Sequence, residues 1–106
     1  MAVLENKAGK FVAPDERSGQ SALAESVTRD GIRPFVTDPT EPGSYPVVTY
    51  SWLLLYKDYE PAKRAALKEF IAWGLTAGQG LGPALGYIPL PDSAVASGKS
   101  VLESIR

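Results

Sequence analysis

Few side chains in this sequence have the chemistry of a catalytic or metal site. The chain has 106 residues and contains neither cysteine nor histidine. Their absence excludes a thiolate nucleophile, a histidine general base and a zinc site built from Cys and His. Lys99 and Ser100 are not a Ser–Lys dyad, because neighbouring residues on a helix point about 100° apart. Since no convincing pair of carboxylates is present either, we expect no catalytic residue, metal site, cofactor or enzymatic activity.

Two short segments have the composition of an anion-binding loop. Arg17-Ser18-Gly19-Gln20-Ser21 places a guanidinium and hydroxyls near a predicted helix start, a place that attracts anions. Because Asp15 is expected to cap that helix, Ser18 and Gly19 fall inside its first turn rather than at its open end. Gly78-Gln79-Gly80-Leu81-Gly82 resembles a nucleotide loop, but such a loop needs a strand before it and a helix after it. Here a helix precedes and Pro83 follows, which indicates a helix terminus.

The aromatic residues and the charges favour a structural interpretation. An aromatic set could stack on a sugar or a base, but alternate residues of a strand face opposite sides, which favours core and rim positions. The net charge is −1, and the densest basic site is the pair Lys63-Arg64, so no nucleic-acid partner is expected. The aromatic set comprises Tyr45, Tyr50, Trp52, Tyr56 and Tyr59.

The first half of the chain predicts a hairpin, a helix and a long connection. Apolar pairs at residues 3–4 and 11–12 flank a polar turn, as in a short hairpin. A helix follows from Asp15 to Asp30-Gly31, with an apolar stripe at Ala22, Leu23, Ser26 and Val27. Four prolines between residues 32 and 46 exclude a regular helix or a central strand there.

The second half predicts a buried strand and two helices. Val47–Tyr56 is β-branched and aromatic, and its last five residues are apolar without alternation, so we expect a strand covered on both faces. A helix begins at Pro61 and runs to Thr76. Tyr87–Pro91 is extended, with Tyr87 partly buried, and Asp92 or Ser93 caps a last helix. Two inward faces are predicted: Ala66, Leu67, Phe70, Ile71, Trp73 and Gly74 on the first helix, and Val95, Gly98, Leu102 and Ile105 on the last.

Three blocks of sequence together resemble the C-terminal end of the phosphate-binding proteins, the solute-binding subunits of bacterial phosphate ABC transporters. They are Leu4 to Pro14, Tyr45 to Trp52, and Phe70 to Ser93, in which Leu85-Gly86-Tyr87-Ile88-Pro89-Leu90-Pro91 is the most specific run. Their order and spacing match the family over nearly the whole chain.

The resemblance implies an α/β fold, namely part of the two-lobed type II periplasmic-binding-protein fold, with one buried strand and about three helices. Residues 1–44 would end the second lobe and include the Pro-rich crossover, and residues 45–106 would return to the first lobe. In the family, phosphate is held in the cleft by helix N-termini, hydroxyls, an arginine and a carboxylate. Those motifs lie outside the part that is matched here, so we assign no ligand-binding residue.

Two hypotheses for the function remain open. In the first, the chain is the scaffold and hinge of a periplasmic or extracellular protein that captures phosphate; its partners, in the complete protein, are inorganic phosphate and the membrane subunits of the transporter. In the second, it is a stand-alone structural or interaction module that binds no phosphate. In either case we expect the isolated chain to pair through Val47–Tyr56, with the remainder of the binding protein or with a second copy, because an uncovered strand edge invites pairing.

Overall fold

A hairpin opens the chain in the computed structural model, which describes residues 1–30, 36 and 38–106. Strand β1 (Leu4–Glu5) pairs antiparallel with β2 (Phe11–Val12), so that Leu4 lies opposite Val12. Gly9 in the connecting turn has a φ of +72°, a conformation that glycine adopts without steric cost. The predicted hairpin is confirmed.

The buried side chain of Asn6 fastens this hairpin to a distant segment. Its Oδ1 accepts hydrogen bonds from the N–H groups of Ala8 and Lys10, both at 3.1 Å. Its Nδ2 donates to the carbonyls of Pro42 at 2.9 Å and Ser44 at 3.1 Å. One amide therefore closes the turn and joins the N-terminus to residues 42–44.

Helix α1 (Glu16–Asp30) begins directly after Asp15, as predicted. The Asp15 carboxylate accepts a hydrogen bond from the Ser18 N–H at 2.7 Å, and the Ser18 hydroxyl accepts one from the Asp15 N–H at 3.0 Å. This exchange satisfies N–H groups at the helix start, as a capping box does. Ala22 and Leu23 are buried, as the apolar stripe predicts. Outside the described residues lie the predicted end at Gly31, the start of the Pro-rich connection (31–35 and 37) and the side chains of Ser26 and Val27.

Helix α2 (Pro61–Gly74) also begins where the sequence predicts, with Pro61 in its first turn. Two 3₁₀ turns follow, η1 (Ala77–Leu81) and η2 (Pro83–Leu85), and they end at Gly86, whose φ is +80°. The glycine-rich segment is thus the terminus of a helical region, as predicted. The predicted inner face of α2 is wrong in part, because Ala66, Phe70 and Trp73 are exposed.

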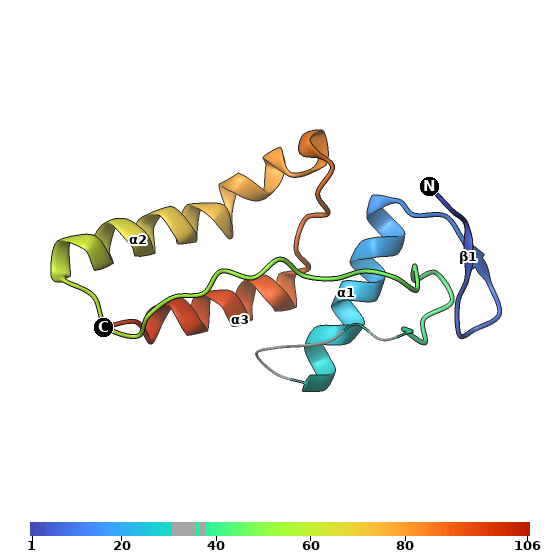
Figure 1. The fold of residues 1–106 in the computed structure, drawn as a ribbon, viewed down its shortest axis with the longest axis horizontal. Helices are drawn as coiled ribbons and strands as arrows, with labels where there is room; N and C mark the ends of the chain where they lie inside the picture. The colour runs from blue at the N-terminus through green and yellow to red at the C-terminus, as the bar shows by residue number, and fades with distance from the viewer. Residues whose placement is uncertain (31–35, 37) are drawn as a thin grey trace.

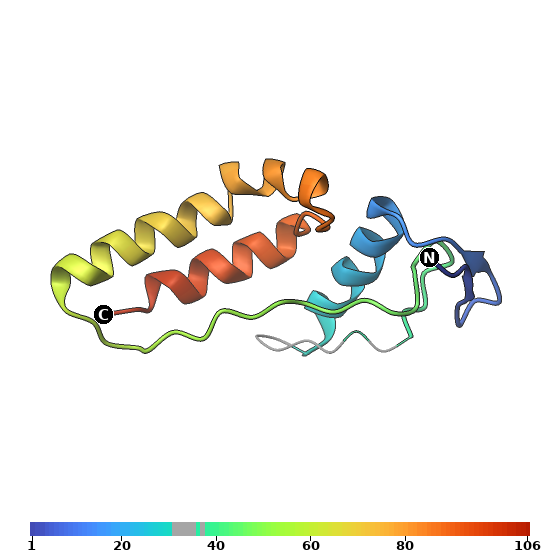
Figure 2. The same cartoon turned by 45° about the horizontal axis from the view of Figure 1, so that its top comes forward.

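Helix α3 (Asp92–Glu103) returns alongside α2 in the opposite direction (Figures 1 and 2). Leu102 and Ile105, both from its predicted inner side, are buried, and Gly98 lies against the side chain of Leu75. The predicted cap was wrong, because Pro91 occupies the N-cap position and no side chain caps the helix. Tyr87 is exposed, contrary to expectation, whereas Ile88 is half-buried.

Residues Val47–Tyr56, predicted as a buried strand, form no strand in the described part of the chain. They run as one stretched segment from the side of α1 to the beginning of α2 (Figure 2). Leu53 is 73% exposed and Leu54 87% exposed, although consecutive residues of an extended chain face opposite sides. The prediction fails here because a strand needs a hydrogen-bonded neighbour, and no described segment provides one. In the described residues, the structure therefore consists of helices and one two-stranded sheet, which is compatible with part of an α/β fold.

The molecule is elongated rather than rounded. Its principal extents are 51 × 29 × 18 Å and its radius of gyration is 15.6 Å, whereas a compact domain of this length has a radius of about 13 Å. The buried apolar residues of the described part form two small groups, Ala22 with Leu23 and Leu102 with Ile105. Much of the apolar surface of the helices is therefore left uncovered.

Candidate functional site

The hydroxyl of Ser18 is engaged in hydrogen bonds at the start of α1. Besides the exchange with Asp15, it donates to the Ala13 carbonyl at 2.8 Å. The hydrogen bond from the Ser18 N–H is the main reason that the pKa of Asp15 lies below its ordinary value of 3.8, and the Ser18 hydroxyl adds to this effect. Neither the hydroxyl nor the N–H of Ser18 is left to contact an anion.

The next polar residues of the same segment also have partners within the chain. The hydroxyl oxygens of Ser21 and the fully buried Ser44 share a hydrogen bond at 2.7 Å. The Nε2 of Gln20 donates to the Pro89 carbonyl at 3.3 Å. These contacts hold α1 against two other segments, so Gln20 and Ser21 act as structural residues here.

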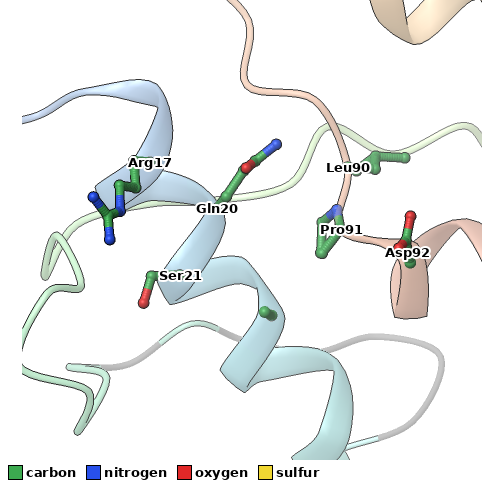
Figure 3. A pocket seen from close by; sticks show the side chains of 7 residues that line it. Arg17, Gln20, Ser21, Leu90, Pro91 and Asp92 are labelled. Atoms are coloured by element: carbon green, nitrogen blue, oxygen red, sulfur yellow. The ribbon is translucent and has the colours of Figure 1, made fainter.

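A shallow hollow lies between α1 and the start of α3 (Figure 3). Its volume is about 380 Å³. The guanidinium of Arg17 lies at one end and the carboxylate of Asp92 at the other, so the hollow has no excess of positive charge. Ser18 and Gly19 do not line it. The lining residues are Arg17, Gln20, Ser21 and Ala24 from α1, followed by Leu90, Pro91 and Asp92.

The side chain of Gln79 organises the glycine-rich segment, a role that its sequence context did not indicate. Its Nε2 donates to the Gly74 carbonyl at 2.6 Å, and its Oε1 accepts from the Leu90 N–H at 2.8 Å. The side chain thus ties the end of α2 to the extended segment before α3. Asn6 was missed in the same way, and the only signal in the sequence was an amide within a turn.

The aromatic residues do not form one platform. Tyr50 and Trp52 make a tilted pair with ring centroids 5.7 Å apart, and Tyr56 and Tyr59 make an edge-to-face pair with centroids 6.1 Å apart. The hydroxyl of Tyr45 donates to the Ala2 carbonyl at 2.9 Å, far back in the sequence. The five residues are therefore spread along the chain, and the structure does not bring them together around a ligand.

Within the described ranges, no cluster of three or more acidic side chains could hold a metal ion. Among the described helices, none combines the length and the apolar character of a membrane span. Lys99 and Ser100 are both exposed on α3. Among the described residues, the geometry therefore shows contacts that hold the fold together and a shallow hollow between α1 and the start of α3.

Comparison with known proteins supplies the family. No family model matches the chain. It is 32% identical over 128 aligned residues to the phosphate-binding protein PstS of Methanocaldococcus jannaschii, and the match covers 100% of this chain and 31% of that protein. It is 34% identical to PstS of Pasteurella multocida (89% of this chain, 28% of that protein) and 30% identical to PstS of Haemophilus influenzae (92% and 30%).

These relatives are named as binding proteins rather than enzymes, which supports a non-enzymatic role. Nearly all of the chain is matched, whereas most of each relative is not. This coverage is consistent with a C-terminal portion of a phosphate-binding protein. Over its whole length, the chain belongs with the phosphate-binding proteins, and it spans less than a third of the length of those it matches.

Proposed function

We propose that the chain is the C-terminal part of a solute-binding protein that captures inorganic phosphate for uptake by an ABC transporter. The observation that carries this proposal is the match of the entire chain to the phosphate-binding protein of M. jannaschii. Since the chain spans about 30% of its relatives, binding phosphate and docking on the transporter belong to the complete protein. The complete protein would have the type II binding-protein fold and act in the periplasm or outside the cell.

Within that protein, we assign this part a scaffold and hinge role without phosphate contacts. The hydrogen bonds of Ser18 and Ser21 support this assignment, because both hydroxyls are already engaged within the chain. The hydrogen bonds from Asn6 to Pro42 and Ser44 join the N-terminal hairpin to the residues just before position 45, which suits two segments at the end of one lobe. Residues 45–106 would then belong to the other lobe.

A chimera tests the proposal directly. In the M. jannaschii protein, the matched segment is replaced by this 106-residue chain, and phosphate binding is measured by calorimetry. We expect saturable phosphate binding with an affinity close to that of the unmodified protein. A chimera that folds, as judged by circular dichroism and a cooperative melt, but does not bind phosphate would contradict the proposal. It would favour the alternative, a stand-alone structural module.

The same chimera tests the scaffold role. Arg17→Ala removes the exposed guanidinium at the edge of the hollow, and we expect it to leave the phosphate affinity unchanged. Ser21→Ala, which removes only the hydrogen bond to Ser44, is the matched control on the same helix. A loss of affinity tenfold or greater for Arg17→Ala alone would assign a phosphate contact to this segment.

A further inference from the structure

Helix α2 has an apolar surface on the side that faces away from α3. Figures 1 and 2 both show α3 along one side of α2 and no other described element along the opposite side. We call this surface the outer face of α2 and define it by Ala62, Ala66, Phe70 and Trp73, which are all exposed. Exposed apolar surface of this kind is typical of an interaction site.

The helical period places the four residues of the outer face together. With about 100° per residue, they lie within about 80° of one another around the helix axis. The exposed residues Lys63 and Glu69 border the outer face on its two sides. On the opposite side of α2, Ile71 is half-buried, and the Nζ of Lys68 donates to the Glu103 carbonyl at the end of α3 at 3.2 Å. Helix α2 therefore has two apolar sides, and in the described part of the chain only one of them packs on another helix.

The order of small and large side chains makes the outer face complementary to itself. The two alanines come first along α2, and the two aromatic residues follow. In a two-fold symmetric pair, residue i contacts residue j and residue j contacts residue i. When two copies of a helix pack antiparallel in this way, the numbers of facing residues have a nearly constant sum. That sum is 136 for Ala66 with Phe70 and 135 for Ala62 with Trp73, so one register satisfies both pairs.

The aromatic side chains already form one raised surface. Phe70 is 65% exposed and Trp73 is 47% exposed, and their rings stack with centroids 6.2 Å apart. The alanines at the other end of the outer face leave room for side chains of this size. Two helices can then approach to about 8–10 Å, and each aromatic side chain inserts between residues of the facing helix. Pairing thereby removes the aromatic rings of both copies from water.

We propose that α2 is a site of self-association, at which two copies of this chain pack antiparallel through their outer faces. Phe70 packs on Ala66 of the partner subunit, and Trp73 packs on Ala62 of the partner subunit. The inference concerns the 106-residue chain itself and does not rest on the proposed function. A helix of 14 residues is about 21 Å long. One such pair buries less than the roughly 1,200 Å² of a stable interface, so we expect a weak dimer with a dissociation constant of about 100 µM.

The same register has one unfavourable contact, which adds a test. Glu69 lies close to the two-fold axis, because 69 is near half of 136, and both copies of its side chain are therefore on the same rim of the interface. Like charges repel weakly at a surface in water, so the repulsion reduces the affinity without preventing association. Glu69→Gln should lower the dissociation constant by about threefold.

Sedimentation of the chain between about 10 µM and 1 mM measures the association. Phe70→Ala leaves a gap opposite the alanine, and Ala66→Phe sets two phenylalanine rings against each other. Each should raise the dissociation constant by about tenfold. Ala65→Phe is the matched control, because it adds the same side chain about 100° away from Ala66, outside the outer face, and it should leave the dissociation constant unchanged. Circular dichroism checks that each variant is folded.

A mixture of the two weakened variants gives a sharper test. When Phe70→Ala and Ala66→Phe chains are mixed in equal amounts, both central contacts of the mixed dimer again have one large and one small side chain. We expect the mixed dimer to form about tenfold more tightly than either variant pairs with itself. The doubly substituted Ala66→Phe/Phe70→Ala chain should recover the native affinity for the same reason. A general loss of folding would produce neither recovery.

Three results would overturn the inference. The first is a chain that stays monomeric up to about 1 mM. The second is a dimer whose affinity is the same in Phe70→Ala, Ala66→Phe and Ala65→Phe, which would assign the contact to another surface such as Val47–Tyr56. The third is a mixture no tighter than its components. If the chain is monomeric and Ala66→Phe lowers the melting temperature of the chimera, the outer face packs inside the complete protein; the inference is then wrong and the proposed function is unaffected.

Discussion

Gly19 of α1 lies so close to Ile88 that a methyl group at Gly19 would overlap the Cδ1 atom of the isoleucine. The neighbouring residue Gln20 donates to the Pro89 carbonyl, across 69 residues of sequence. The first turns of α1 and the extended segment before α3 are therefore held together by a close apolar contact and a hydrogen bond, side by side. If the two halves of the chain belong to different lobes, this contact lies at their junction.

The close approach predicts a strong coupling between two substitutions. Gly19→Ala should lower the free energy of unfolding by about 1 kcal/mol, because the new methyl group displaces Ile88. In an Ile88→Ala background the same change should be neutral or stabilise by up to about 1 kcal/mol, since alanine favours a helix over glycine. Urea denaturation of the four proteins measures both effects. Equal effects in the two backgrounds would contradict the contact.

Replacement of Asn6 should destabilise the protein, and the loss of stability in the Asn6→Asp variant should depend on pH. Asn6→Ala removes four hydrogen bonds around a buried site and should destabilise by about 2 kcal/mol or more. Asn6→Asp keeps the acceptor for Ala8 and Lys10 but turns a carboxylate oxygen towards the carbonyls of Pro42 and Ser44. Burial and repulsion would raise the pKa of that carboxyl, so the Asn6→Asp protein should gain stability as the pH falls through it. Denaturation of the Asn6→Asp protein at pH 4 and at pH 7 tests this prediction. A higher stability at pH 7 than at pH 4 would contradict it.

The cap of α1 predicts a different dependence on pH. The pKa of Asp15 is lowered in the folded protein, so its contribution to stability is fully present above the ordinary value of 3.8. This contribution is lost as the pH falls through the lower, folded-state pKa. Asp15→Asn keeps a hydrogen-bond acceptor but no charge, so the difference in stability from the native chain should shrink below pH 3.8.

Ser18→Ala provides the comparison for this prediction. It removes the hydroxyl but keeps the backbone N–H, which is the main cause of the lowered pKa of Asp15. The variant should therefore be less stable at every pH and retain most of the pH dependence. Thermal melts between pH 2 and pH 7 measure the stability of each variant and its dependence on pH. If the stability of Asp15→Asn depended on pH in the same way as that of the native chain, the capping role of Asp15 would be contradicted.

Local signals in the sequence predicted where α1 and α2 begin and where the glycine-rich segment ends. Asp15, Pro61 and Gly86 act on the backbone of their own turn, so their effects can be read without knowledge of distant residues. The same reasoning placed Ser18 inside the cap of α1 before its hydrogen bonds were known. By contrast, the partners of Asn6 lie 36 and 38 residues away, and no local rule identifies them.

The stretched segment shows why the buried strand could not be predicted reliably from 106 residues. An apolar, β-branched composition indicates that residues such as Leu53 and Leu54 need cover, and it does not say which chain supplies that cover. The error over Phe70 and Trp73 has the same origin, because their positions on α2 were assigned to a core within this chain. The apolar pattern predicts that these residues are buried, and no segment among the described residues buries them.

We expect the isolated chain not to bind phosphate at physiological concentrations. Tight recognition of phosphate needs several donors that converge on its oxygens, such as backbone N–H groups at a helix start together with an arginine fork. At the start of α1, the Ser18 N–H already donates to Asp15, and the hydroxyls of Ser18 and Ser21 are engaged within the chain. Arg17 remains, but the hollow beside it ends at the carboxylate of Asp92, which repels an anion. Calorimetric titration with phosphate, beside the M. jannaschii protein as a positive control, should give no saturable heat from this chain. Saturable binding in the micromolar range that Arg17→Ala abolishes would contradict the prediction and identify α1 as a phosphate site.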